Sequence, residues 1–256
     1  MPDSPPPVSN HFAVPGVARR YATGRPYIHD VVAQAIFQHT GAIGRALDVG
    51  AGTGLSTRAL LRGAEQIIGI DPSVEMLDAA FRNPRVRYVA GTGECLPLSS
   101  SCIDLVTVSA AYHWCRHDAL FGELERVVRP GGWIAIYDVE LVGILEAPSL
   151  IGWLRNDYWA QLPRCSHFGA FDPATGPHPP FVMIAATTTS VDVPMTIDES
   201  VSFVLSQASS INAVATGARS LETLEQRLRG AFETAFPRRL AATARFDVPS
   251  FLLRRA

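Results

Sequence analysis

Residues 46 to 54 read Ala-Leu-Asp-Val-Gly-Ala-Gly-Thr-Gly, an apolar strand that runs directly into glycines at positions 50, 52 and 54. A second apolar run, from Ile67 to Ile70, ends at Asp71. Glycines at the carboxyl end of a first strand let the backbone turn tightly and approach a ligand, and an acidic residue about 20 positions further on can accept two ribose hydroxyls. The spacing is G-x-G-x-G and not G-x-G-x-x-G, so the pattern favours a nucleoside ligand without a pyrophosphate.

Strands and helices alternate through the first half of the chain. We expect strands at about 45 to 49, 66 to 70, 86 to 90, 103 to 109 and 132 to 138, and helices near 27 to 39, 55 to 63, 73 to 81 and 118 to 128. The sequence Pro130-Gly131-Gly132 is expected to stop the last of these helices. Such alternation predicts right-handed crossovers and a mainly parallel sheet with helices on both faces.

The second half of the chain breaks this rhythm. Residues 141 to 182 are rich in proline and aromatic side chains, and we expect a helix near 149 to 160 followed by a long loop. A strand from 182 to 193, helices opening at Asp198 and Ser220, and an antiparallel edge strand at 240 to 253 follow. The expected organisation is a disordered segment 1–10, a ligand-binding core 11–140, a cap or substrate region 141–182, and a C-terminal part 183–256 that completes the sheet.

Composition excludes several classes of partner. The 256 residues are 47% hydrophobic, carry a net charge of -2 and have a pI near 6.4, so no basic stripe for nucleic acid is expected. The spacing of Cys95, Cys102, Cys115 and Cys165 fits neither paired metal ligands nor a disulfide framework, and no metal site is predicted. Without a signal-peptide pattern or 18 consecutive apolar residues, the chain is expected to be soluble and cytoplasmic, with no membrane partner.

Four consecutive motifs resemble those of class I S-adenosylmethionine (SAM)-dependent methyltransferases. They read "LDVGAGTG", "GIDPSVEML", "GTGECLPLSSSCIDLVTVSAAYHW" and "LERVVRPGGWIAIYD". The preceding "YATGRPYIHDVVAQAI" is similar to the Y-x-x-x-R-P-x-Y leader of the small-molecule branch that includes trans-aconitate methyltransferase-like enzymes. The resemblance covers about residues 19 to 138. It implies a Rossmann-like α/β fold, a doubly wound and mainly parallel seven-stranded sheet with a reversed last strand and a helical, aromatic cap, with SAM as cofactor and S-adenosylhomocysteine (SAH) as product.

The resemblance also assigns cofactor contacts, and most of them have a competing structural role. Asp48 can orient the glycine loop or the methionine amino group, Asp71 can cap a helix as well as bind ribose, and Met76 can pack in the core as well as on adenine. Arg25 can pair with the methionine carboxylate, or it can simply begin a surface helix. The expected cofactor-binding residues are Tyr21, Arg25, Asp48, Gly50, Ala51, Gly52, Gly54, Asp71, Pro72, Met76, Thr92, Gly93, Glu94 and Ser109.

One histidine is a candidate for chemistry. His113 follows the fourth expected strand, where it could accept a proton from an acceptor hydroxyl or orient that group. The alternative is that His113 and Trp114 only shape the loop. The aromatic cap predicts a small, partly apolar methyl acceptor, with oxygen acceptors such as carboxylates favoured, although its rings could equally be ordinary core. The expected substrate-binding residues are Tyr27, His113, Trp114, Trp153, Tyr158 and Trp159.

Two other functions compete with methyl transfer. A nicotinamide oxidoreductase could use a similar glycine loop, but position 55, where a third glycine would be expected, is Leu55. A catalytically silent SAM-binding or scaffolding protein would have the same motifs, because no single residue is diagnostic of turnover. The sequence does not indicate an oligomeric state.

Overall fold

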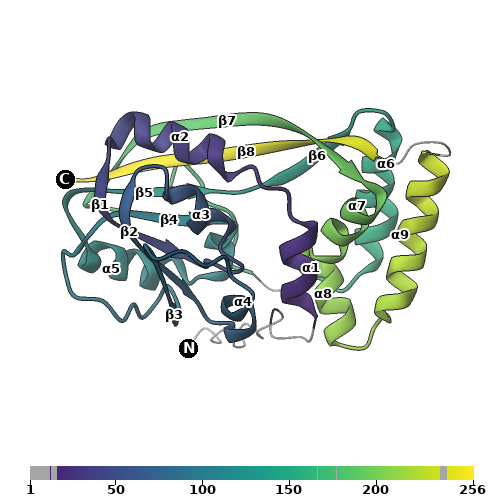
Figure 1. Cartoon of the computed structure of the whole chain (residues 1–256), viewed down its shortest axis with the longest axis horizontal. Coiled ribbons are helices and arrows are strands. Elements are labelled where there is room, and N and C mark those ends of the chain that lie inside the picture. Colours follow the sequence, from purple (N-terminus) through teal and green to yellow (C-terminus); the bar gives the residue numbers. More distant parts are fainter. Residues whose placement is uncertain (1–11, 13–15, 166, 177, 237–240) are drawn as a thin grey trace.

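An eight-stranded sheet organises the part of the chain that the computed structural model describes, namely residues 12, 16–165, 167–176, 178–236 and 241–256. The expected disordered segment 1–10 lies outside these residues. The strands are β1 (Ile43–Val49), β2 (Ala64–Asp71), β3 (Val86–Ala90), β4 (Ile103–Ser109), β5 (Val128–Tyr137), β6 (Glu140–Ile144), β7 (Phe181–Thr196) and β8 (Ala241–Arg255). Figure 1 shows β1 to β5 in one half of the molecule, and the long strands β7 and β8 reach from there to a group of helices in the other half.

The strand order is β3-β2-β1-β4-β5-β8-β6, and β7 pairs with β8. Strands β1 to β5 are parallel, whereas β8 runs antiparallel to β5, β6 and β7. The reversed last strand is therefore confirmed. The described sheet has eight strands and not seven, and β8 is not an edge strand. It lies inside the sheet because β7 pairs along its whole length on one side, while β5 and β6 share the other.

Helices cover both faces of the parallel strands, as the continuous apolar runs predict. On one face, α2 (His29–Thr40) and α3 (Leu55–Leu60) contribute Val32, Ile36 and Leu60 to a cluster that includes Ile67 of β2. On the other face, α5 (His117–Val127) packs Leu120 and Leu124 against β4 and β5. The short helix α4 (Val74–Asp78) follows β2.

The change from α5 to β5 comes earlier in the chain than expected. Helix α5 ends at Val127 and β5 begins at Val128, so Pro130-Gly131-Gly132 lies within the strand and does not stop the helix. The pairing of β4 with β5 shifts its register between Ile103 and Leu105, and Gly131 takes a positive φ of 73° there. The glycine thus accommodates an irregularity in the strand.

The second half of the molecule is helical (Figure 1). Residues 148–161 form one winding segment made of α6 (Pro148–Trp153), a π-helical turn (Leu154–Tyr158) and a 3-10 turn (Trp159–Gln161). It contacts α9 (Leu221–Ala235), and α7 (Ile197–Leu205) contacts both α9 and α1 (Val17–Gly24). Helix α8 (Ala208–Ala215) was not expected from the sequence. Helices α7 and α9, which follow β7 in the sequence, therefore pack with α1 and segment 148–161, and these elements together form the helical half.

Helix starts in this half follow local side-chain chemistry. Thr196, and not Asp198, caps α7 in a reciprocal capping box with Glu199. Ser220 caps α9 by accepting a hydrogen bond from the Thr223 amide, as predicted.

Residues 140–144 form strand β6, although the sequence analysis placed the boundary between core and cap there.

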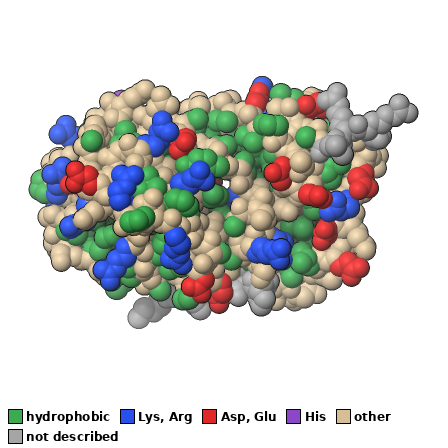
Figure 2. Space-filling view, in the orientation of Figure 1, with side chains coloured by type: hydrophobic (Ala, Val, Ile, Leu, Met, Phe, Trp, Pro, Cys, Tyr) green, Lys and Arg blue, Asp and Glu red, His purple; other side chains and the backbone are tan. Residues whose placement is uncertain are grey.

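Figure 2 shows arginine side chains spread among hydrophobic and acidic ones on the face in view. Within the described ranges, no helix is both long enough and apolar enough to cross a membrane.

Candidate functional site

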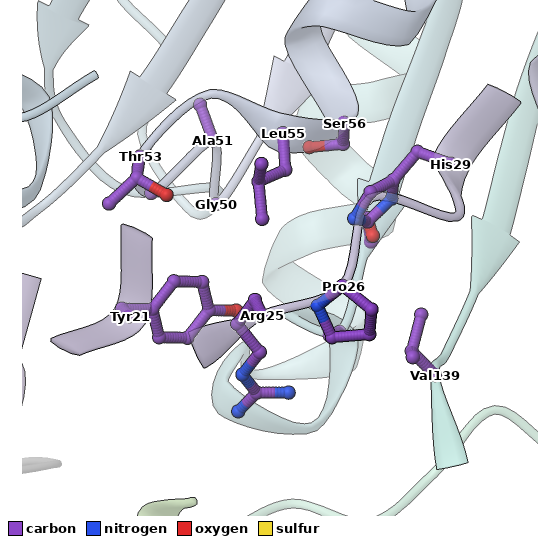
Figure 3. A pocket seen from close by; sticks show the side chains of 13 residues that line it. Tyr21, Arg25, Pro26, His29, Gly50, Ala51, Thr53, Leu55, Ser56 and Val139 are labelled. Atoms are coloured by element: carbon purple, nitrogen blue, oxygen red, sulfur yellow. The ribbon is translucent and has the colours of Figure 1, made fainter. Parts of the chain in front are cut away.

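A pocket opens at the carboxyl edge of the parallel strands (Figure 3). The sheet register brings the ends of neighbouring strands level, with Val49 beside Ile70 and Val108, and Ser109 beside Tyr137. Loops that leave these ends therefore meet at one edge, where open α/β sheets bind ligands. The pocket is lined by the glycine loop after β1, the leader before α2, and residues that follow β4 and β5.

The glycine loop requires its glycines. Gly50, Gly52 and Gly54 have φ values of 71°, 52° and 82°, which side-chain-bearing residues rarely adopt. A Cβ atom at Gly50 would overlap the Cβ of Ala111, and one at Gly54 would overlap the Tyr88 hydroxyl. The amides of Gly50 and Ala51 both donate to the carbonyl of Ile70, at 2.8 and 3.0 Å. The loop is therefore held in one conformation against the end of β2.

Asp71 connects the glycine loop to the start of α4. Its Oδ2 accepts a hydrogen bond from the Gly52 amide at 2.9 Å, and its Oδ1 accepts one from the Ser73 amide at 2.8 Å. Burial raises the pKa of this carboxyl, and the two amide hydrogen bonds oppose that rise. Ser73, and not Asp71, is the N-cap of α4, accepting from the Met76 amide. Each carboxylate oxygen keeps lone-pair capacity for a ligand hydroxyl.

Asp48 is fully buried and engaged by three hydroxyl groups. Its Oδ2 accepts from Ser56 and Thr57 at 2.6 Å each, and its Oδ1 accepts from Thr107 at 2.7 Å. Burial raises the pKa of Asp48, and these hydrogen bonds oppose the rise. Through these hydrogen bonds the Asp48 side chain links α3 and β4 to the end of β1. Asp48 is not among the residues that line the pocket.

The other residues predicted on the cofactor's adenine side follow β2 and β3. Met76 is buried, and its Cε lies 3.3 Å from the position of a Cβ built on Gly52. Gly93 leaves almost no space for a side chain between Val49 and Leu120. Glu94 accepts a hydrogen bond from the Arg116 amide at 2.9 Å and so braces the loop. Pro72 is exposed, and Thr92 forms an isolated bridge with Cys95.

The leader places a positive charge at the pocket. The Arg25 guanidinium lies 4.5 Å from the centre of the Tyr21 ring, and both residues line the pocket. Arg25 donates to the hydroxyl and the carbonyl of Ser206, at 3.0 and 3.1 Å. In the described part of the chain, Arg25 has no carboxylate in ion-pair contact. Tyr27, by contrast, donates to Asp30 at 2.8 Å and is not part of the lining, so the structure does not bring it to the pocket.

His113 lies beside the pocket and faces a carboxylate. It is in the short turn Tyr112–Trp114 after β4, with Nδ1 3.6 Å from Oδ2 of Asp138. Burial lowers the pKa of His113, as does the nearby ring of His167, whereas Asp138 raises it. The centres of the His113 and Trp114 rings are 5.1 Å apart. Neither residue lines the pocket, but Ser109 and Ala110, just before them, do.

The three aromatic residues expected in the cap do not reach the pocket. Tyr158 is fully buried, with its hydroxyl 3.3 Å from that of Ser210, and Arg227 lies over the rings of Trp153 and Tyr158. Trp153 and Trp159 pack against the same hydrophobic cluster. The apolar face of segment 148–161 thus packs in the core of the helical half. Trp153, Tyr158 and Trp159 therefore have the positions of ordinary core residues, which was the alternative to a substrate-binding role.

Sequence reasoning missed His29, Tyr137, Thr53 and Ser56. His29, Thr53 and Ser56 line the pocket, and the Nδ1 atom of His29 lies 3.0 Å from the buried Tyr137 hydroxyl. Burial lowers the pKa of His29 from 6.5 to about 4. The available signal was a histidine on the apolar face of the helix directly after the leader. Within the described residues, no group of three histidine, cysteine or acidic side chains could hold a metal ion.

Sequence comparisons identify the central part of this arrangement. Residues 47–136 match a family described as "Methyltransferase domain". An uncharacterized methyltransferase of Mycobacterium tuberculosis is 39% identical over 116 residues, 42% of this chain and 46% of that protein. The malonyl-[acyl-carrier protein] O-methyltransferase of Pectobacterium atrosepticum is 33% identical over 144 residues, 55% of this chain and 54% of that protein. The match thus spans about half the length of these curated relatives.

The fold as a whole has a solved counterpart. The structure of a candidate type II methyltransferase from Anaeromyxobacter dehalogenans superposes with a TM-score of 0.70 at 20% identity, covering 87% of this chain and 94% of that one. At this identity the likeness concerns the fold. It extends beyond residues 47–136 to most of the chain.

Proposed function

We propose that this chain, which carries a methyltransferase domain in residues 47–136, binds SAM and transfers its methyl group to a small, partly apolar metabolite. The observation that carries the proposal is the glycine loop tied to Asp71 through the Gly52 amide. A carboxylate held at the end of β2, beside a loop without side chains, suits a nucleoside with two ribose hydroxyls. SAM, when bound, supplies an activated methyl group on a sulfonium.

Two features of the pocket fit that cofactor. The loop closes too tightly on its neighbours for a Cβ at Gly50 or Gly54, so its backbone is the surface that a ligand would meet. The Thr53 hydroxyl is buried at the pocket without a hydrogen-bond partner in the described structure, although buried hydroxyls are normally paired. A ligand with polar groups along the loop would satisfy it.

The leader would bind the methionine part of the cofactor, and the residues after β2 and β3 would bind its adenosine part. Arg25 keeps guanidinium donors beyond those used on Ser206, and a charge-assisted pair with the methionine carboxylate would use them. Tyr21 would cover the same part of the ligand, because its ring lies against Arg25. Asp71, with Met76, Thr92 and Gly93, would hold the adenosine end.

We favour an oxygen acceptor, including carboxylates. Apart from the Arg25 guanidinium, the polar side chains of the lining beyond the glycine loop are hydroxyls and an imidazole, and apolar side chains such as Pro26 and Val139 stand beside them. The Pectobacterium relative is named as an O-methyltransferase, which is compatible with this choice. The chain's main task would be to align the acceptor and exclude water, since positioning alone can supply on the order of 7 to 11 kcal/mol.

Calorimetric titration with SAH and with NAD, followed by transfer of labelled methyl from SAM to a metabolite extract, tests the function. We expect binding of SAH and not of NAD, and label in a small metabolite. Binding of NAD alone would favour an oxidoreductase. Binding of SAH without any transfer would favour a silent SAM-binding protein.

His113 has two possible roles in that function, and one variant separates them. If its imidazole accepts a proton from the acceptor or orients it, with Asp138 holding the ring, His113→Ala lowers turnover and leaves SAH binding unchanged. If His113 only shapes the loop after β4, turnover and SAH binding fall together. Measuring the dissociation constant for SAH beside the transfer rate distinguishes these outcomes.

A further inference from the structure

His29 is a buried histidine with one ring nitrogen unused. It occupies the first position of α2, is 8% exposed, and lines the pocket. Its Nδ1 is in hydrogen-bond contact with the Tyr137 hydroxyl at 3.0 Å, which fixes the orientation of the ring. Nε2 has no hydrogen-bond partner among the described residues. Nε2 is also not among the buried side-chain atoms that lack a partner, so it is accessible from the pocket and available to a ligand atom.

The position of His29 within the pocket indicates which ligand that is. Figure 3 shows His29 and Val139 at one end of the pocket and Thr53 of the glycine loop at the other. Tyr137, which supports His29, is the last residue of β5, and Val139 follows it closely in sequence. This end is therefore built by strand ends and the start of α2, not by the loop assigned to the cofactor.

We infer that His29 binds the methyl acceptor, with Nε2 hydrogen-bonded to an oxygen of that molecule and Tyr137 holding the imidazole in place. The inference rests on the proposed function and names a contact for its substrate. In the tautomer in which Tyr137 donates to Nδ1, the ring proton is on Nε2, which donates to a carboxylate or carbonyl oxygen; in the other tautomer Nδ1 donates to Tyr137, and Nε2 accepts a hydrogen bond from a hydroxyl oxygen of the ligand. The acceptor class is a small molecule with such an oxygen and an apolar portion against Pro26 and Val139.

The chemistry around His29 supports a neutral hydrogen-bonding role. Burial lowers its pKa to about 4, and the nearby Arg25 acts in the same direction, so the imidazole is uncharged near neutral pH. Burial also raises the pKa of Tyr137, which keeps the phenol protonated and able to donate. Arg25 supplies the positive charge of the pocket, and His29 adds a directional contact without a second charge.

Two substitutions of His29 test separately the contacts made by Nδ1 and by Nε2. His29→Asn keeps a polar atom near the position of Nδ1 and removes Nε2, whereas His29→Gln extends an amide toward the position of Nε2. His39→Asn makes the same chemical change at an exposed position at the other end of α2 and is the matched control. Thermal unfolding followed by circular dichroism establishes that each variant is folded.

The experiment measures SAH binding by calorimetry and the initial rate of labelled methyl transfer from SAM to a metabolite extract. We expect H29N to bind SAH within about twofold of wild type and to transfer methyl at least tenfold more slowly. H29Q should recover part of the rate, and H39N should match wild type.

Two results would overturn the inference. A loss of SAH affinity in both H29N and H29Q that equals the loss of rate would assign His29 to the cofactor. A wild-type rate in H29N would show that Nε2 is not used. If H29N does not fold, H29Q is judged by the same two measurements against H39N. A wild-type chain that binds SAH but transfers no methyl refutes the proposed function itself, and the acceptor role of His29 falls with it.

Discussion

Acidification should destabilise the folded chain through His29, and the effect can be estimated. In the folded state burial and Arg25 lower the pKa of this imidazole from 6.5 to about 4, against an opposing effect of Asp30. The unfolded chain therefore takes up the proton first as the pH falls. Stability is unaffected by His29 above about pH 6.5 and decreases as the pH falls from there through about 4.

The size of the effect follows from the same values. At about 1.4 kcal/mol for each pKa unit, the gap between 6.5 and about 4 corresponds to about 3 to 4 kcal/mol, of which about 2 to 3 kcal/mol is already lost at pH 4.5. Because only 8% of His29 is exposed, solvent screening reduces this figure little. Domains are typically stable by about 5 to 15 kcal/mol, so the loss would be easily measured.

The assay is urea unfolding of wild type, H29N and H39N at several pH values between 7 and 4.5. The quantity of interest is the difference between variants, since burial raises the pKa of Asp48 and Asp71 and those carboxyls act in the opposite direction. We expect the free energy of unfolding of wild type to fall by about 2 to 3 kcal/mol more than that of H29N, with H39N following wild type. Parallel curves for wild type and H29N would refute the buried, neutral state of His29.

Three further substitutions test the site and the fold. Gly50→Ala adds a methyl group that overlaps Ala111 at a positive φ, so it should lower the free energy of unfolding by at least about 1 to 2 kcal/mol and abolish SAH binding measured by calorimetry. The control is Gly122→Ala in α5, which has open space around the added atom and should be neutral or slightly stabilising. Equal SAH affinity in the two variants would contradict the proposal that the glycine loop binds the cofactor. Asp71→Asn leaves only one side-chain acceptor for the amides of Gly52 and Ser73, and we expect at least a tenfold rise in the SAH dissociation constant; an unchanged value would remove Asp71 from the site. Thr196→Ala breaks the capping box of α7 and should lower the free energy of unfolding by about 1 kcal/mol while SAH binding stays unchanged, so a change in binding would link the helical half to the pocket.

Local signals were sufficient for the parallel half of the fold. The apolar run before Gly50, the spacing to Asp71 and the alternation of strands and helices depend on neighbours within a few residues, and β1 to β4 lie where they were expected to within two residues. The Ser220 cap was found for the same reason. Thr196 was missed because a capping box needs the exact helix start, which the strand-like residues before it obscure.

The amino-acid sequence by itself determined the glycine loop and the parallel strand-helix alternation, because hydrophobic periodicity and motif spacing are properties of short stretches of chain; the reversed last strand was implied by the resemblance to class I methyltransferases. Only the tertiary structure decided that β8 lies inside the sheet, that Trp153, Tyr158 and Trp159 pack in a core, and that His29 meets Tyr137 at the pocket. These outcomes depend on which segments, far apart in the sequence, pack against each other and exclude water from the surface between them. His29 and Tyr137 are separated by 108 positions, and no local pattern records that they touch.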